Sequence, residues 1–281
     1  MKCNLCGSEK NKFILKSKDR NHKTSAKYFR LVKCKICGLV FIDPPPTEKE
    51  ITNSYPRNYL PHLEEKAIGK HEEPITRVDS GVKRFLDFGC GSGKLLDYQK
   101  SKHPNWAFYG LEINANACEI AQKKGFNVFC GALEKAPYEK NFFDLIIARH
   151  VLEHMPDPRN TLSRLYDLLK PGGEISITLP NISGLSIKLF KSYAFQLELP
   201  RHLYHFSPKT LEAMLRKENF EIQKVKFDGS PKVLARSIGF LLGRSWINPP
   251  SLLMKLFRPL SVIAARLGKS DIFSIRARKP L

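Results

Sequence analysis

The chain lacks any apolar run long enough to span a bilayer, which takes about 20 predominantly apolar residues. Its first residues, MKCNLCGSEK, also lack the apolar segment of a secretory signal. We therefore expect a cytoplasmic protein without a transmembrane helix.

Acidic residues are scarce: 27 Asp and Glu stand against 47 Lys and Arg, which leaves a formal charge of +20 over 281 residues. Hydrophobic residues make up 42% and charged residues 26%, proportions that suit a packed globular protein and exclude a mostly disordered one. The length predicts one large domain or two unequal ones. The excess of positive charge indicates an anionic partner, either nucleic acid or an acidic membrane surface.

Four of the seven cysteines form two pairs with the same spacing: Cys3-x-x-Cys6 and Cys34-x-x-Cys37. Each pair places two thiolates on one tight turn, and two facing turns make a tetrahedral four-sulfur site. The segment between the pairs has room for a hairpin of 12–15 with 29–33. We therefore predict a zinc ribbon over residues 1–43, with a structural Zn²⁺ held by these four cysteines. A disulfide framework is the alternative, disfavoured by the missing export signal and the three single cysteines.

Residues 44–80 are predicted to be a connector, since recurring prolines interrupt regular structure there. A short helix is expected at 47–51. Tyr55 and Tyr59 are candidate lid residues over a ligand, and the alternative is that their rings pack on the next domain.

From residue 82 to 179 the sequence alternates strand-forming and helix-forming segments. The expected strands are 82–88, 106–111, 126–130, 143–148 and 174–179, and the expected helices are 94–102, 114–124 and 158–169. Repeated strand–helix units imply an α/β fold, with a parallel sheet covered by helices on both faces.

A glycine-rich turn follows the first of these strands. Residues 89–93 read Gly-Cys-Gly-Ser-Gly, and a helix is expected directly after them. Small residues let the backbone approach a ligand closely, and the N-terminus of the helix offers unpaired N–H groups. Glu112 ends the second strand 21 residues after Gly91, where a carboxylate is placed to accept ribose hydroxyls. The combination indicates a nucleotide-type cofactor.

The turn and its surroundings resemble the class I S-adenosylmethionine-dependent methyltransferases. The similarity is carried by DFGCGSG at 87–93, GLE at 110–112, FDLI at 143–146, HVLEHMPDP at 150–158 and LLKPGG at 168–173. The resemblance implies a Rossmann-like, seven-stranded methyltransferase sheet within residues 81–281. It also implies S-adenosylmethionine as the cofactor.

By this resemblance, the cofactor-binding residues are Asp87, Gly89, Gly91, Gly93, Glu112, Leu133 and His150. The glycine turn would hold the methionine part with Asp87 nearby, and Glu112 would hold the ribose. The backbone at Leu133 would flank the adenine. Ala132 stands where many relatives carry an Asp for the adenine amino group, which is a departure from the common pattern.

Enzymes that methylate exocyclic base amines usually carry an Asn/Asp-Pro-Pro-aromatic loop after the fourth strand. This chain has Arg-His-Val-Leu at 149–152 instead, so a hydroxyl or carbon acceptor is favoured. The segment around His202 resembles zinc-ribbon sugar C-methyltransferases, in which a histidine at this position acts as base. Arg201 replaces the Glu that precedes it in those enzymes. Residues around His154 resemble ubiquinone-pathway O-methyltransferases.

Neutral imidazole is well suited to removing a hydroxyl proton. His202 and His154 are therefore the predicted catalytic residues, and His150 and His205 are further candidates. The alternative for each histidine is a structural role in capping or in hydrogen bonding to a loop carbonyl.

The C-terminal part carries much of the positive charge. Residues 220–227 and 271–278 are expected to be the last two strands, with the final one antiparallel. Between them lies an insertion at about 230–270 that mixes large apolar residues with spaced Lys and Arg, and residues 222–281 contain 12 basic but only two acidic side chains. The pattern predicts amphipathic helices on an anionic membrane surface. A helical layer on the enzyme's own core and nucleic-acid binding are the alternatives.

Together these features predict an S-adenosylmethionine-dependent methyltransferase that O-methylates, or else C-methylates, a sugar or lipid-linked glycan at the inner face of the membrane. The alternative enzyme is an rRNA or tRNA methyltransferase that binds RNA through the basic zinc ribbon. The alternative of another class is a non-catalytic cofactor-binding scaffold.

Overall fold

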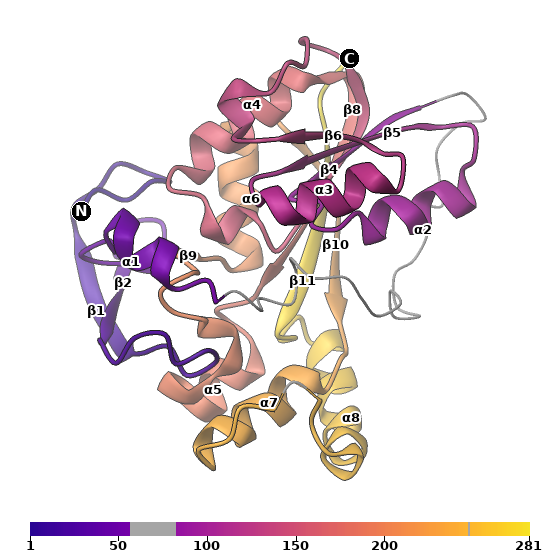
Figure 1. Ribbon diagram of the computed structural model, residues 1–281. Helices are drawn as coiled ribbons and strands as arrows, with labels where there is room; N and C mark the ends of the chain where they lie inside the picture. Colours follow the sequence, from indigo (N-terminus) through magenta and orange to yellow (C-terminus); the bar gives the residue numbers. More distant parts are fainter. Residues whose placement is uncertain (57–82, 247) are drawn as a thin grey trace.

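A seven-stranded mixed sheet forms the centre of the molecule (Figure 1). The structure is a computed structural model that describes residues 1–56, 83–246 and 248–281. The sheet has the order β10-β11-β8-β7-β4-β5-β6, in which β11 runs antiparallel to both neighbours and the β8-to-β6 pairs are parallel. Its strands are β4 (Arg84–Phe88), β5 (Ala107–Glu112), β6 (Asn127–Cys130), β7 (Phe143–Arg149), β8 (Leu169–Pro180), β10 (Glu221–Asp228) and β11 (Ile272–Arg278). The α/β fold implied by the resemblance is confirmed.

Most strand ends lie within two residues of their predicted positions, but β8 begins five residues early. Leu169 pairs with Phe143, and the next pair joins Glu174 to Leu145. The four residues between them therefore bulge out of the ladder, because Gly172 takes a left-handed φ of 75°.

Helices cover both faces of the sheet, as predicted (Figure 1). Side chains alternate along a strand, so neighbouring residues of β4 enter different cores. Helices α2 (Lys94–Lys102) and α3 (Ala115–Lys123) cover one face, and α4 (Pro158–Leu168) and α6 (Pro208–Lys217) cover the other. Phe85 belongs to the apolar cluster beneath α2 and α3, and Leu86 belongs to the cluster beneath α4 and α6.

A second, four-stranded sheet lies at the N-terminal end of the chain. It contains the predicted hairpin of β1 (Asn11–Ser17) and β2 (Phe29–Cys34), followed by β3 (Val40–Ile42). Its fourth strand, β9 (Tyr204–His205), comes from the methyltransferase-like part and pairs antiparallel with β3. The sequence analysis did not predict β3 or β9.

The N-terminal sheet shares one hydrophobic core with the larger sheet. Leu31 and Phe41 belong to the same buried cluster as Leu86 and Leu165. The division of the chain into 1–43, 44–80 and 81–281 stays a prediction, since the β3–β9 pairing crosses it. Most of the predicted connector, including Tyr59, lies outside the described residues, but the helix expected at 47–51 is present as α1 (Glu48–Asn53).

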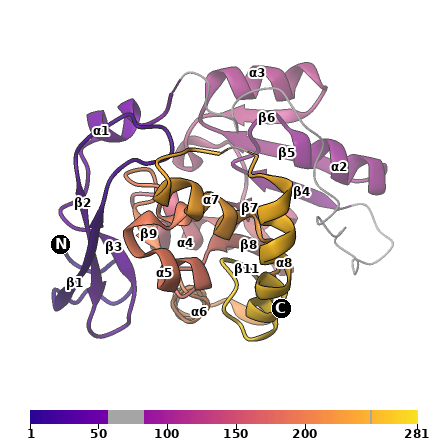
Figure 2. The same ribbon diagram turned by 90° about the horizontal axis from the view of Figure 1, so that it is seen from below.

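The C-terminal insertion consists of α7 (Lys232–Leu241) and α8 (Ser251–Arg266). It leaves the sheet after Asp228 and returns at Ile272, which pairs with both Asp228 and Pro180, the last residue of β8. The insertion therefore lies at the carboxyl edge of the parallel strands. Figure 2 shows α7 and α8 on the same side of the molecule as α5 (Leu185–Phe190).

The described residues also contain four 3₁₀ helices: η2 (Leu133–Lys135), η3 (Leu152–His154), η4 (Lys191–Tyr193) and η5 (Phe195–Leu197). Among the helices of the described ranges, none has both the length and the apolar character needed to cross a bilayer.

Candidate functional site

The glycine turn after β4 has a backbone that only glycine adopts readily. Gly89, Gly91 and Gly93 have left-handed φ values of 76°, 53° and 80°. A Cβ added at Gly89 would lie 2.3 Å from Val151, so the turn packs tightly against the segment that follows β7. Gly93 caps α2, and the first N–H groups of that helix therefore open onto the turn.

Glu112 ties the end of β5 to this turn. Its Oε2 accepts the Gly91 N–H at 2.9 Å, and its Oε1 accepts the N–H groups of Ile113 and Asn114 at 2.8 and 2.9 Å. An ionised carboxylate has about four acceptor positions, so it retains capacity for a ligand hydroxyl. The Ser92 hydroxyl is buried and has no hydrogen-bond partner among the described residues. A free acceptor and an orphaned hydroxyl at one turn fit a ligand with ribose hydroxyls and amino-acid groups, as S-adenosylmethionine has.

The other residues predicted to bind the cofactor lie along the same edge. Asp87 is buried near the end of β4, and Leu133 opens η2 after β6. His150 directly follows β7, has a left-handed φ of 54° and has a side chain that is 46% exposed. All seven predicted residues thus lie at or beyond the carboxyl ends of four neighbouring strands, where open α/β sheets bind ligands. Their roles in binding remain predictions.

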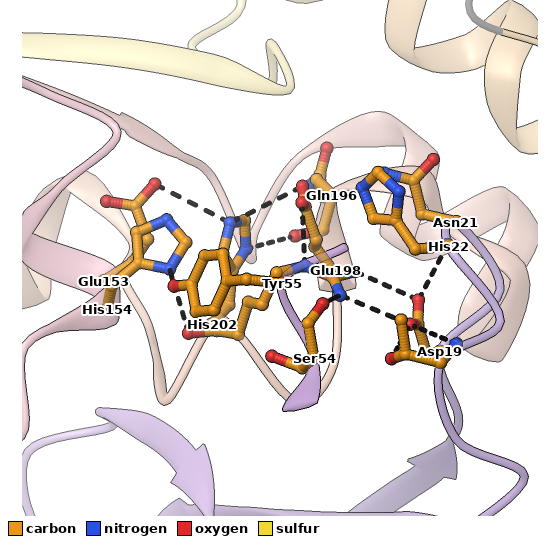
Figure 3. A network of polar contacts seen from close by, with 12 residues as sticks. Asp19, Asn21, His22, Ser54, Tyr55, Glu153, His154, Gln196, Glu198 and His202 are labelled. Carbon is orange, nitrogen blue, oxygen red and sulfur yellow. Dashed lines mark hydrogen bonds and ion pairs between the residues drawn. The ribbon is translucent and has the colours of Figure 1, made fainter. Parts of the chain in front are cut away.

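A group of histidines lies at the same edge (Figure 3). The ring centroids of His154 and His202 are 4.8 Å apart in a T-shaped arrangement, and those of His202 and His205 are 6.1 Å apart. His154 ends η3, whereas His202 and His205 lie about 50 residues further along the chain. The structure therefore brings both predicted catalytic histidines together.

Backbone carbonyls set the tautomer of each predicted catalytic histidine. His154 Nδ1 lies 2.9 Å from the Arg201 carbonyl, and His202 Nδ1 lies 3.0 Å from the Gln196 carbonyl. A carbonyl only accepts, so Nδ1 carries the proton and donates it in both rings. In the neutral form, Nε2 of each histidine is then the basic nitrogen.

Two carboxylates face His202, and the sequence analysis identified neither. Glu153 Oε1 lies 3.9 Å from His202 Nε2 and 3.4 Å from His150 Nδ1, and Glu198 Oε2 lies 3.8 Å from His202 Nε2. Glu153 is 1% exposed, and neither of its oxygens has a hydrogen-bond partner among the described residues. Glu198 precedes His202 by four residues. The resemblance to sugar C-methyltransferases instead places a Glu directly before the histidine, at position 201.

Burial holds His202 and His205 in the neutral form. Desolvation lowers the pKa of His202 well below its usual value of 6.5, and it lowers the pKa of His205 to about 3. His202 is therefore unprotonated at neutral pH. The carboxylate of Glu153 and nitrogens of His154 and His202 also lie within 4.8 Å of one another, a donor set that a divalent metal accepts.

Arg201 is fully buried and joins the N-terminal sheet to the histidine loop. Its guanidinium donates to both oxygens of Asp19 at 3.0 and 3.2 Å, to Glu198 Oε1 at 3.1 Å and to the Ser54 carbonyl at 2.7 Å. Burial alone raises the pKa of the Asp19 carboxyl, but the hydrogen bonds and charge of Arg201 outweigh this and hold the pKa at about 2. The residue that departs from the family pattern is thus the centre of an ion-pair network. Figure 3 shows its partners Asp19, Ser54 and Glu198 close to His202.

Tyr55 covers part of the histidine group. Its hydroxyl lies 3.3 Å from His154 Nδ1, and the ring centroids of the two side chains are 6.5 Å apart. Burial raises the pKa of Tyr55 to about 12. The tyrosine predicted as a lid residue therefore contacts the candidate site directly.

The four cysteines of the predicted zinc site also come together. The Sγ atoms of Cys3 and Cys37 are 3.4 Å apart, those of Cys6 and Cys34 are 3.5 Å apart, and all four lie within 4.8 Å of one another. A disulfide needs about 2.05 Å, whereas tetrahedral Zn–S bonds of about 2.3 Å place sulfurs about 3.8 Å apart. Burial opposes ionisation of Cys34, but the N–H groups of Cys37 and Ile36 lower its pKa to about 7. The donor set fits Zn²⁺.

Comparison with known proteins agrees with this geometry. Residues 56–225, more than half of the chain, match a family model described as a methyltransferase domain. The chain is 28% identical over 133 residues to a ubiquinone biosynthesis O-methyltransferase of Coxiella burnetii, which covers 45% of this chain and 53% of the relative. It is 32% identical over 99 residues to a demethylmenaquinone methyltransferase of Lactococcus lactis, covering 32% and 39%. The chain therefore spans about half, or less, of the length of these curated relatives.

A solved structure supports the fold. The S-adenosylmethionine-dependent methyltransferase of Archaeoglobus fulgidus superposes with a TM-score of 0.50 at 23% identity, over 71% of this chain and 87% of that one. At this identity, the likeness concerns the fold alone.

Replacing Asp19 with Asn should lower the free energy of unfolding by about 3 kcal/mol at pH 7, because the buried Arg201 charge loses its partner. The folded pKa of Asp19, about 2, lies below the unfolded value of about 3.9. The stabilisation is therefore present above about pH 4 and is lost as the pH falls toward about 2. Urea denaturation of both proteins across this range should show the difference between them narrowing.

Asp43→Asn is the matched control for this substitution. Asp43 pairs with the N-terminal amine and is 26% exposed, so its loss should cost under about 1 kcal/mol. Equal stability of Asp19→Asn and wild type at pH 7 would contradict a stabilising role for the pair.

Proposed function

The chain belongs to the methyltransferase-domain family, and from this premise we propose that it transfers a methyl group from S-adenosylmethionine to a hydroxyl oxygen of its acceptor. The observation that carries the proposal is the histidine group, in which two imidazoles have their Nδ1 atoms engaged by backbone carbonyls and one of them, His202, lies within 4 Å of two carboxylates. A hydroxyl must lose its proton during methylation, and such a group supplies a general base.

The residues along the carboxyl edge would hold the cofactor, which supplies an electrophilic methyl group. The glycine turn and Ser92 would bind the amino-acid part. Glu112 would accept a ribose hydroxyl through its remaining acceptor position, and the backbone at Leu133 would lie against the adenine. His150 would meet the cofactor from the end of β7, and its Nδ1 lies 3.4 Å from Glu153 Oε1.

His202 is the proposed base. Its Nδ1 is engaged by a carbonyl, so Nε2 takes the proton from the acceptor hydroxyl. The imidazolium that forms then lies within 4 Å of the carboxylates of Glu153 and Glu198, which stabilise its positive charge. His154 is the second candidate, because its Nε2 is also the basic nitrogen and its ring lies against that of His202.

The acceptor is proposed to be a membrane-associated molecule with a free hydroxyl. The two curated relatives carry names from ubiquinone biosynthesis and demethylmenaquinone methylation, which favour a lipid quinol. The sugar or lipid-linked glycan expected from the sequence stays a hypothesis, because neither name refers to such an acceptor. A lipid quinol and a lipid-linked glycan share a neutral hydroxyl on a carrier that partitions into lipid.

The four-cysteine group is proposed to bind Zn²⁺ as a structural ion. The four sulfurs would fill a tetrahedral shell and leave no open position for a substrate. The ion would therefore hold the turns of the N-terminal sheet and take no part in methyl transfer.

Tritium-labelled methyl transfer tests the function. The purified protein and labelled S-adenosylmethionine are added to a cell extract, which is then separated into RNA, lipid and small-molecule fractions. We expect label in the lipid fraction, at an oxygen, and none above the protein-free control in RNA. Label in RNA would overturn the proposal of a membrane-associated acceptor, and no label in any fraction would favour the scaffold alternative.

His202→Gln tests the base. Gln has no basic nitrogen, so kcat should fall by about 10² or more while the affinity for S-adenosylmethionine, measured by calorimetry, stays unchanged. The same comparison with His154→Gln identifies which histidine acts. His103→Gln, on the far end of α2, is the control.

The pH profile gives a second readout of the same base. Because burial lowers the pKa of His202 well below 6.5, the basic form persists as the pH falls, and kcat should stay level from about pH 8 to about pH 6. A rate that falls with an apparent pKa at or above about 6.5 would assign the proton to another group.

Metal analysis tests the zinc proposal. The wild type should retain one zinc per chain after dialysis, whereas Cys34→Ser should lose zinc and melt at lower temperature, because the ion stabilises the fold. Cys130→Ser removes an exposed cysteine outside the group and should change neither quantity. A wild type free of zinc, with unchanged melting after chelator treatment, would remove the ion from the proposal.

A further inference from the structure

One face of α8 presents a row of large apolar side chains to solvent. Leu252, Leu256, Ile263 and Leu267 are 75, 66, 52 and 69% exposed, and Leu260 is 38% exposed. With 3.6 residues per turn, these five positions fall within an arc of about 80°. The opposite side of the helix is buried through Ser261 and Ala264. The row is therefore a continuous stripe that the protein's own core leaves uncovered.

A row of positive charge lies beside this stripe. It consists of the exposed residues Lys255, Arg258, Arg266 and Lys269, and no acidic residue occurs from 251 to 270. None of the four cations takes part in an ion pair with any residue that the structure describes. We call the stripe and this row together the α8 face.

The end of α7 extends the same surface. Leu241 and Leu242 are 51 and 62% exposed, and exposed Arg244 follows them. Figure 2 shows α7 and α8 next to each other on the near side of the molecule, and residues of the two helices are in contact. The apolar and basic character therefore belongs to a surface and not to one helix alone.

We propose that the α8 face docks on an anionic lipid bilayer, with the leucine stripe in the headgroup–acyl boundary and the cations among the headgroups. An amphipathic helix with a basic polar face lies in a membrane interface in this way. Phosphate contacts to a nucleic acid would use the cations but leave the leucines in water. A second copy of the chain is disfavoured, because a twofold contact would bring the basic row against itself with no acid to pair.

The position of the insertion links this surface to the candidate site. Ile272 follows the insertion and pairs with Pro180 at the carboxyl end of β8, the edge at which the glycine turn and the histidine group also lie. Docking would therefore hold the site close to the bilayer. The docking inference stands on the exposed surface alone, and its test needs neither cofactor nor acceptor.

Vesicle co-sedimentation of the whole, zinc-loaded protein tests the inference. The probes are vesicles of phosphatidylcholine alone and of phosphatidylcholine with phosphatidylglycerol. We expect binding to the anionic vesicles only, weakening as salt rises from about 0.05 M to about 0.5 M, since screening acts on the cations. No binding of the wild type to anionic vesicles, or equal binding to both kinds, would overturn the proposal.

Two pairs of variants separate the leucines from the cations. Leu256→Asn should weaken vesicle binding about tenfold, whereas Phe13→Asn, which removes a 53% exposed ring from β1, should leave it unchanged. Arg258→Gln should weaken binding about threefold to fivefold and reduce its salt dependence, whereas Lys35→Gln on the N-terminal part should not. An equal loss of vesicle binding for the two variants of either pair would show that net charge or nonspecific hydrophobic adsorption accounts for binding. This result would overturn docking through the α8 face. Melting curves confirm that each variant is folded.

Discussion

The buried ion pair between Arg201 and Asp19 is the interaction on which the candidate site depends. A guanidinium removed from water carries a large desolvation cost, which only well-placed acceptors offset. Here the acceptors come from three distant parts of the chain: Asp19 after β1, the Ser54 carbonyl after α1, and Glu198 in the loop itself. Each of these segments must therefore take its place for Arg201 to be buried. The ion pair adds a condition on the fold that apolar packing alone would not impose.

The chemistry of the site follows from this constraint through the backbone of Arg201. The carbonyl of Arg201 accepts a hydrogen bond from the Nδ1–H of His154, and the residue after Arg201 is His202. A displaced guanidinium would move both the tautomer-setting acceptor of one histidine and the ring of the other. Strands β1 to β3, which the β3–β9 pairing joins to the histidine loop, thus position a site to which they contribute no reacting group.

The parts of this arrangement that were predictable from sequence are local. Strand–helix alternation, the glycine turn with Glu112 and the paired cysteines each depend on residues close in the chain. The pairing of β3 with β9 joins residues about 160 positions apart through two short strands, which carry no periodic signal. Glu198 was not predicted because it faces His202 from four residues earlier in the loop, whereas the family comparison concerned only the residue directly before His202. Burial of Arg201 could not be foreseen, because charged residues are rarely buried without a partner and its partner Asp19 lies 182 positions earlier in the chain.

The distribution of charge is consistent both with methylation of a neutral hydroxyl at the candidate site and with docking of the α8 face on an anionic surface. The chain carries a formal charge of +20, yet the two charged groups within 4 Å of the His202 ring nitrogen are the carboxylates of Glu153 and Glu198. Carboxylates close to the reacting position favour the imidazolium that forms when a neutral hydroxyl loses its proton, and they disfavour an anionic group at the same point. The cations of the α8 face lie outside, where an anionic surface would meet them. An acceptor whose charged or lipid-bound part is distant from its neutral hydroxyl suits both the carboxylates at His202 and the cations of the α8 face. An acceptor with a phosphate next to the methylated atom suits only the cations.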